Sequence, residues 1–170
     1  HLSLNFHNKP LLGVVLIPEK EELWIADGDK VWSEKKNGLK YKPNNLFKEN
    51  IHDMTLVISK NHNNKVLKKL VSKLPVKDVI SMGSVGCKIS SIIKGESDFY
   101  ISLSLPGKSA PKDWDFAAPE ALLKCAGGSI TNEKNEPLSY NKNNYLQSGL
   151  IIASSNRNNH ENLCQIIKES

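Results

Sequence analysis

The sequence is poor in cysteine and in arginine. Its three cysteines, Cys87, Cys125 and Cys164, are odd in number and show no C-x-x-C spacing. This pattern argues against a disulfide framework or a zinc site, and it is typical of a protein in a reducing cytoplasm. Arg157 is the only arginine among 23 basic residues. Because the lysines are spread along a chain of net charge +5, we expect a solvated surface and no nucleic-acid partner.

Long apolar runs are also absent. No stretch approaches the ~18 residues that a membrane-spanning helix needs. Residues 1–10 lack the basic start and apolar stretch of a signal peptide, so we expect no membrane association. The chain does not begin with Met, and residues 1–6 already alternate between apolar and polar as in a strand. This start indicates a chain that begins inside a sheet.

The chain does contain enough apolar sequence for a globular core. Hydrophobic residues make up 39% of the 170 positions and charged residues 24%. The alternating residues 1–6, the apolar run 11–18 and the turn signal Asp27-Gly28-Asp29 predict an antiparallel meander. We assign residues 1–50 to an antiparallel sheet region followed by a polar connection.

From residue 54 onward, strand patterns alternate with helix patterns. The predicted strands cover 54–60, 77–82, 97–104 and 149–155, and the predicted helices cover 61–74, 84–95, 113–128 and 158–168. This alternation predicts a layered α/β domain with a largely parallel sheet over residues 51–170. Ligands collect where the strands of such a sheet end, so the loops at those points are candidate sites.

The first candidate loop is Ser59-Lys60-Asn61-His62. His62 can contact a ligand there. Alternatively, Asn61 or Ser59 can cap the following helix by accepting a hydrogen bond from its free N–H groups. The residues alone leave both interpretations open, because a histidine in an exposed loop is common.

The second candidate loop runs from Gly83 to Lys88 and reads GSVGCK. Glycines and a serine at a helix start let backbone N–H groups approach an anion, and the helix dipole favours phosphate there. Lys88 adds a positive charge in the first turn. The glycines can equally serve only to turn the chain from strand to helix. The sequence has no GxxxxGK[ST] pattern, which excludes a Walker A loop.

The third candidate is the acid pair Asp113 and Asp115 at the start of the 113–128 helix. An aspartate at a helix start is stabilised by the dipole, so either acid can be a cap. Mg²⁺ prefers carboxylate oxygens and takes only one or two from protein beside phosphate and water. We predict that Asp113 caps the helix and that Asp115 binds the metal. Small residues such as Ala118 and Ala121 let this helix pack close to the sheet.

At this point the sequence resembles a known family. WDFAAPEALLKCAGGSIT is similar to the WDxAAxxxxLxxAGG signature of the inositol monophosphatase superfamily of Mg²⁺-dependent phosphatases. The APE within it, the loop VISKNHNNK and the turn MGSVGCK resemble the 3′(2′),5′-bisphosphate nucleotidase branch, also called CysQ-type. GLIIASS resembles the family's last core strand. The resemblance spans essentially the whole chain and implies the α/β fold of inositol monophosphatases.

The resemblance also implies roles for single residues. Asp115 would be a ligand of the catalytic Mg²⁺ pair and would lie beside the substrate. Gly83, Ser84 and Val85 would offer backbone or hydroxyl donors to one phosphate. The expected partner is therefore a small phosphate ester such as 3′-phosphoadenosine 5′-phosphate.

Positive charge for the rest of that ester is implied by further residues. Lys88 would pair with the second phosphate, and His62 would lie against the nucleotide. Lys108 and Lys112 would add charge near the same site. Some relatives carry an arginine just after the strand that includes DFYI, where this chain has Ser102 and Leu103. This departure bears on the second phosphate and therefore on the substrate.

A larger departure concerns the metal. The family's DPxDGT loop, which supplies other metal ligands, does not occur in the sequence. We therefore expect a C-terminal portion of the enzyme, with one of the metal carboxylates and no activity by itself. Without partner strands and helices, the opening meander should leave sheet edges and apolar faces open and promote association.

The predicted function is a cytoplasmic Mg²⁺-dependent bisphosphate nucleotidase of sulfur metabolism, present in part, that converts 3′-phosphoadenosine 5′-phosphate to AMP and phosphate. An inositol or sugar phosphatase of the same superfamily is one alternative. A non-catalytic nucleotide-binding or interaction module is another. Either a monomer or a homodimer is compatible with the resemblance.

Overall fold

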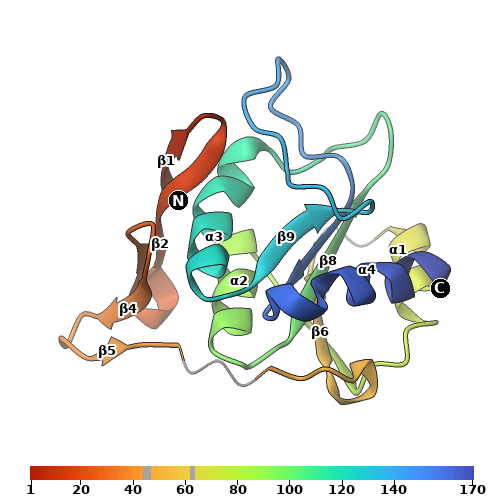
Figure 1. The fold of residues 1–170 in the computed structure, drawn as a ribbon, viewed down its shortest axis with the longest axis horizontal. Helices are drawn as coiled ribbons and strands as arrows, with labels where there is room; N and C mark the ends of the chain where they lie inside the picture. The colour runs from red at the N-terminus through yellow and green to blue at the C-terminus, as the bar shows by residue number, and fades with distance from the viewer. Residues whose placement is uncertain (44–46, 62–63) are drawn as a thin grey trace.

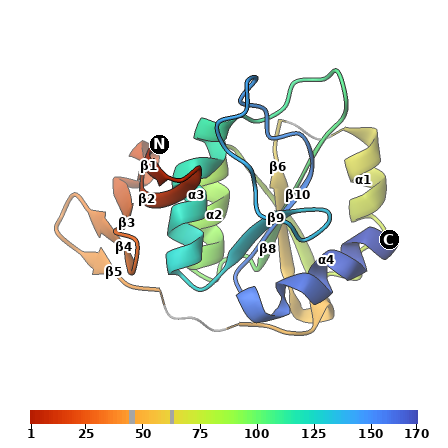
Figure 2. The same cartoon turned by 45° about the horizontal axis from the view of Figure 1, so that its top comes forward.

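The computed structural model describes residues 1–43, 47–61 and 64–170. In this part of the chain, two five-stranded sheets alternate with two pairs of helices. The helices α2 (Val85–Ile93) and α3 (Asp113–Cys125) lie between the sheets, and α1 (Lys65–Val71) and α4 (His160–Glu169) cover the far face of the second sheet (Figures 1 and 2). The predicted layered α/β fold is confirmed. Short 3₁₀-helices lie at Pro18–Lys20, Ile51–Asp53 and Arg157–Asn159.

The first sheet is an antiparallel meander in chain order, as the alternation predicts. Its strands are β1 (Leu2–Phe6), β2 (Lys9–Ile17), β3 (Glu22–Ala26), β4 (Val31–Lys35) and β5 (Lys40–Tyr41). The β3–β4 hairpin turns where the Asp27 carboxylate accepts the N–H groups of Asp29 at 3.0 Å and Lys30 at 2.7 Å. The short edge strand β5 lies in the stretch that we expected to be an irregular connection.

The two faces of this sheet have different surroundings. The inner face, with Val15 and its cross-strand partner Trp24, is buried against α2 and α3. On the outer face, Leu2 pairs with Val14, and Val14 pairs with Ile25. This row is apolar but stays partly or fully exposed, and none of the described helices lies on that side in Figure 2.

The second sheet is largely parallel, as predicted, but one of its five strands runs in the opposite direction. Its order is β7 (Asp78–Met82), β6 (Thr55–Ser59), β8 (Phe99–Ser104), β10 (Gly149–Ser154) and β9 (Ser129–Asn132). β6 is parallel to β7 and β8, whereas β10 is antiparallel to β8 and β9. The crossover through α3 leads to β9 at the sheet edge, and the connection 133–148 then reverses the chain. β10 therefore enters between β8 and β9 in the opposite direction.

Two hydrophobic clusters hold these layers together. The larger one joins both sheets through α2 and α3, and it includes Trp24, Ile89 and Phe116. The smaller one lies under α1 and α4 and includes Leu67 and Leu163. The boundary that we placed near residue 50 stays a prediction. Among the described residues, no helix is long and apolar enough to cross a membrane.

Candidate functional site

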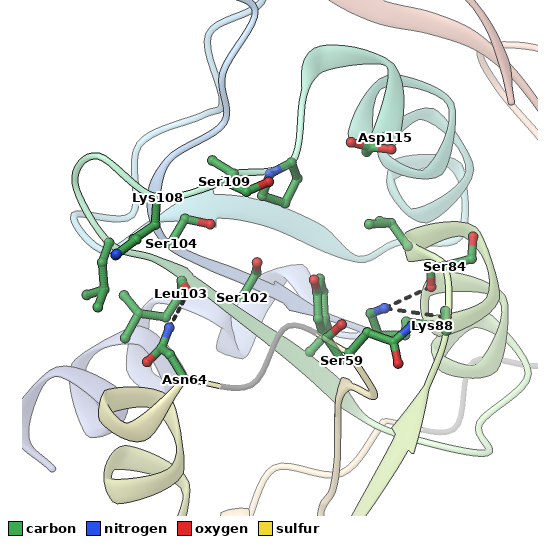
Figure 3. A pocket seen from close by; sticks show the side chains of 17 residues that line it. Ser59, Asn64, Ser84, Lys88, Ser102, Leu103, Ser104, Lys108, Ser109 and Asp115 are labelled. Carbon is green, nitrogen blue, oxygen red and sulfur yellow. Dashed lines mark hydrogen bonds between the residues drawn. The ribbon is translucent and has the colours of Figure 1, made fainter.

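A cavity of about 670 Å³ opens where the parallel strands β6, β7 and β8 end. Loops that follow all three strands contribute to it, together with the start of α3 (Figure 3). This is the edge at which α/β sheets usually bind ligands. The lining residues are Ser59, Asn61, Asn64, Gly83, Ser84, Val85, Lys88, Tyr100, Ser102, Leu103, Ser104, Leu105, Lys108, Ser109, Ala110, Pro111 and Asp115.

The glycine-rich turn forms one wall of the cavity. Ser84 is the N-cap residue of α2 and has φ 45° and ψ 138°, a conformation that costs energy for any residue with a Cβ. Neither Gly83 nor Ser84 donates its backbone N–H within the part of the chain that the structure describes. Val85 and Gly86 open the helix, where N–H groups lack intrahelical acceptors. Successive unpaired N–H groups at a helix start suit an anion.

Lys88 lies beneath this turn and is only 2% exposed. Its ammonium donates to the carbonyl oxygens of Ser84 at 2.9 Å, Gly83 at 3.4 Å and Met82 at 3.5 Å. It also lies 5.1 Å from the centre of the Tyr100 ring. Burial lowers the pKa of Lys88 to about 8, although nearby negative charge, including that of Asp115, acts in the opposite direction.

The structure contradicts the cap predicted for Asp113, whereas the metal role of Asp115 stays a prediction. The N-cap position is occupied by Lys112, and its backbone N–H donates to Asp115 Oδ2 at 2.8 Å. Asp113 does not cap: its carboxylate accepts the Asn141 N–H at 2.6 Å and the Gln147 side-chain amide at 2.7 Å. The prediction was wrong on the cap because the helix begins at Asp113, one residue earlier than a cap at that position requires. Asp115 nevertheless lines the cavity.

The floor of the cavity is a row of hydroxyl groups that the sequence analysis missed. Tyr100, Ser102 and Ser104 alternate along β8 and all line the cavity. Burial raises the pKa of Tyr100 to about 12, and its hydrogen bond with Ser102 opposes the shift. Two-residue spacing of polar groups within an otherwise apolar strand was the signal that could have found them.

The other end of the cavity is formed by Asn64, Leu103 and the exposed Lys108 (Figure 3). The Asn64 side chain donates to the Leu103 carbonyl at 2.9 Å and accepts the Leu67 N–H at 2.9 Å. Asn64 is therefore the N-cap of α1, which corrects the assignment of that role to Ser59 or Asn61.

The predictions for Lys112 and His62 have different outcomes. Lys112 does not line the cavity, and its ammonium lies 5.0 Å from the centre of the Trp114 ring. His62 lies outside the described residues, although Asn61 and Asn64 on either side of it line the cavity. The structure does bring together Gly83, Ser84, Val85, Lys88, Lys108 and Asp115.

The fit of these residues to Mg²⁺ is partial. Asp115 is the only carboxylate among the lining residues, and Oδ1 accepts no hydrogen bond within the described residues. One carboxylate can serve a Mg²⁺ ion that takes its other oxygens from phosphate and water. No group of three or more His, Cys, Asp or Glu side chains suited to a metal occurs in the described part of the chain. The residues present therefore do not complete a site for a metal pair.

Comparison with known proteins identifies the relatives of this chain. The sequence profile of the Inositol monophosphatase family matches residues 1–170. The chain belongs to this family. It is 31% identical over 157 residues to the 3′(2′),5′-bisphosphate nucleotidase CysQ of Buchnera aphidicola. These residues make up 91% of the chain and 56% of that protein. CysQ of Escherichia coli K12 is 26% identical over 154 residues, which cover 90% of the chain and 58% of that protein. The chain thus spans a little over half the length of these relatives.

Solved structures show the same fold. An inositol monophosphatase from Zymomonas mobilis superposes with a TM-score of 0.75 at 20% identity, covering 98% of this chain and 60% of that one. CysQ from Bacteroides thetaiotaomicron gives a TM-score of 0.70 at 23% identity, covering 91% and 62%. The predicted family and fold are both confirmed.

Proposed function

We propose that this chain forms the phosphate-ester-binding part of a phosphatase of the inositol monophosphatase family, and that its substrate is 3′-phosphoadenosine 5′-phosphate, cleaved to AMP and phosphate. One observation carries the proposal: a single cavity is lined by the N–H-rich turn at Gly83–Val85, by the buried Lys88 beneath it and by Asp115 with its carboxylate. These groups come from two segments of the chain, the turn into α2 and the start of α3. The similarity to bisphosphate nucleotidases supports the choice of substrate.

Ser84 and Lys108 lie on opposite sides of the cavity in Figure 3, which suits an ester with two charged groups. The cavity volume of about 670 Å³ lies in the range of small-molecule sites. The turn at Ser84 would receive one phosphate, because its backbone N–H groups and the start of α2 favour an anion. Lys108 at the opposite end would attract the second negative charge, and the wall near Leu103 offers apolar surface for the base.

Asp115 would provide one oxygen ligand for Mg²⁺ beside the bound phosphate. When bound there, Mg²⁺ supplies positive charge that stabilises developing charge on phosphate oxygens and lowers the pKa of water. The chain's own residues bind and orient the ester. Because the described residues do not complete a metal-pair site, we expect the 170-residue chain to bind phosphate esters weakly and to hydrolyse them negligibly.

A second candidate is a nucleotide-binding module without catalytic activity. The observation that favours it is the single carboxylate in the cavity. A further alternative within the family is an inositol or sugar phosphatase. A staphylococcal family member has been solved with inositol monophosphate and with 2′AMP, so ligands of both kinds occur on this fold.

Calorimetric titration of the 170-residue chain separates the nucleotide ligand from the inositol or sugar phosphate. We expect adenosine 3′,5′-bisphosphate to bind at least about tenfold more tightly than inositol 1-phosphate, a difference of about 1.4 kcal/mol. If the folded chain binds neither ester, the proposal is overturned. Equal or tighter binding of inositol 1-phosphate would favour the sugar-phosphate alternative. Phosphate release assays with Mg²⁺ then test activity, and rapid turnover by this chain alone would contradict the expected inactivity.

A further inference from the structure

Lys88 is held by the turn that it supports. Its ammonium contacts three successive carbonyl oxygens, those of Met82, Gly83 and Ser84, where β7 ends and α2 begins. An ammonium group has three N–H donors and no acceptor. One carbonyl lies at 2.9 Å from the ammonium and two more lie at 3.4 and 3.5 Å, and the Tyr100 ring lies beside the same group. In Figure 3 the side chain points back toward its own turn.

Removal from water makes these contacts necessary. Lys88 is 2% exposed, and a buried cation is costly unless its hydrogen bonds are made within the protein. A cation in the first turn of a helix also opposes the helix dipole. The carbonyl oxygens of Met82 to Ser84 offset both costs by surrounding the charge with partial negative charge. A direct bond from Lys88 to a substrate phosphate would require it to give up at least one of them.

The same contacts compensate a weak point in the backbone. Ser84 has a positive φ of 45°, and the first helical hydrogen bond, from Lys88 N–H to the Ser84 carbonyl, is long at 3.4 Å. The ammonium reaches that carbonyl at 2.9 Å. Lys88 therefore closes the first turn of α2 with its side chain where its backbone does so poorly.

We propose that Lys88 is a positioning residue whose ammonium fixes the conformation of the turn from Met82 to Gly86, so that the backbone N–H groups of the turn, and not the ammonium, meet the substrate phosphate. This differs from the direct pairing with a second phosphate that the family resemblance implies. The inference rests on the proposed function only in naming phosphate as the ligand. The effect of Lys88 on the free turn does not depend on it.

Two substitutions separate positioning from direct contact. Lys88→Met removes the ammonium but keeps an unbranched side chain, and Lys88→Gln removes the charge but keeps N–H donors. Amide hydrogen exchange and ¹H–¹⁵N spectra of the ligand-free chain report on the turn. Inorganic phosphate and adenosine 3′,5′-bisphosphate serve as ligands. Lys108→Met is the matched control, because Lys108 lines the same cavity but is exposed.

We expect Lys88→Met to speed amide exchange at Lys60 and at position 88, whose N–H groups donate to the carbonyls of Met82 and Ser84, at least about tenfold without ligand. Phosphate binding should weaken by a similar factor. Lys88→Gln should retain most of the protection and most of the binding. Lys108→Met should weaken bisphosphate binding and leave exchange in the turn unchanged. If Lys88→Met fails to fold, Lys88→Gln alone decides the question.

Two outcomes would overturn the inference and favour direct contact. One is a Lys88→Met chain whose ligand-free turn shows unchanged exchange and spectra. The other is a Lys88→Gln chain that loses phosphate binding while its turn stays fully protected. Failure of the unsubstituted chain to bind any phosphate ester would count against the proposed function. The exchange measurement on the free chain would still test the role of Lys88.

Discussion

Gly13 in β2 lies directly against Ala118 in α3, so that a Cβ built on Gly13 would stand 2.6 Å from the Ala118 carbonyl oxygen. The same atom would lie 2.9 Å from the Ala121 Cβ. These contacts confirm that the small residues of α3 allow close packing on the sheet. Asp115 belongs to the same helix as Ala118 and Ala121, so these contacts also set the position of Asp115 relative to the cavity.

Gly13→Ala should therefore destabilise the protein. The added methyl group meets backbone and cannot be relieved by a rotamer change, so we expect a loss of about 1–3 kcal/mol in the free energy of unfolding. Urea denaturation measures this loss. Gly83→Ala is the control, because nothing lies within 4 Å of its added Cβ and its φ is not positive. An equal loss in both variants would contradict the close-packing argument.

The positive φ of Ser84 leads to a second prediction. Glycine adopts such a conformation without the Cβ penalty, whereas a β-branched residue tolerates it least. The Ser84 side chain makes no cap hydrogen bond, so its removal loses no cap. We expect Ser84→Gly to raise the free energy of unfolding by about 0.5 kcal/mol and Ser84→Val to lower it by more than about 1 kcal/mol. Chemical denaturation of both variants checks the order, and a Ser84→Val protein as stable as Ser84→Gly would refute the strain.

Sequence patterns predicted the elements well but not all of their directions. The alternation in β1 to β4 and the strand–helix succession after residue 54 both reflect burial, which a sequence records residue by residue. The orientation of β10 depends on how the connection 133–148 folds back, and no local pattern records that. The sequence pattern therefore predicted this strand but not its reversed direction.

The same contrast holds for the cavity. Gly83 and Lys88 could be found because turn chemistry is local. Tyr100 and Ser102 lie on one face of β8 and share a two-residue polar spacing, but the packing of α3 beside β8 is needed to show that this face borders a cavity. The sequence analysis assigned the cap to Asp113, whereas Asp115 is the acid that accepts the N–H of the N-cap residue Lys112. The reason is that a helix start read from sequence is uncertain by a residue or two.

The open outer face of the first sheet predicts association. Leu4 and Leu16 on this face are 56% and 58% exposed, and such apolar patches promote contact with other chains. We expect light scattering and dye binding to show self-association at micromolar concentration. Leu4→Lys combined with Leu16→Lys should reduce both signals and change the free energy of unfolding by less than about 0.5 kcal/mol. Val15→Lys, on the buried face of the same sheet, should unfold the chain. A monodisperse unsubstituted chain at this concentration would contradict the predicted association.

His160 gives the fold a dependence on pH. It is buried between the hydroxyls of Thr131 (2.8 Å) and Ser154 (2.7 Å), and burial lowers its pKa to about 4. His160 in the unfolded chain takes up a proton near pH 6.5, whereas His160 in the folded chain stays neutral down to about pH 4. The contribution of neutral His160 to the free energy of unfolding is therefore complete above pH 6.5 and declines as the pH falls to about 4. The loss is at most about 3 kcal/mol. Urea denaturation between pH 7 and 4.5 measures it, and His160→Gln should show a smaller slope. Equal slopes in both proteins would refute the assignment.

The neighbouring acids of α3 allow a matched test of the metal role. Asp115→Asn keeps an oxygen that can accept the Lys112 N–H, so the helix start should remain folded while the charge is lost. Asp113→Asn replaces one of two accepting oxygens with a donor and should lose about 1–2 kcal/mol of stability, because Asn141 and Gln147 donate to both oxygens.

We expect Asp115→Asn to lower the Mg²⁺-dependent part of adenosine 3′,5′-bisphosphate binding at least about tenfold, with little change in unfolding. Asp113→Asn should show the reverse pattern. Calorimetry with and without Mg²⁺, together with urea denaturation, measures both quantities. Since the two residues lie two positions apart on one helix, a general disturbance of its start would affect both variants alike. Unchanged Mg²⁺ dependence in Asp115→Asn would show that this carboxylate is not a metal ligand. Its role would then be limited to accepting the Lys112 N–H at the start of α3.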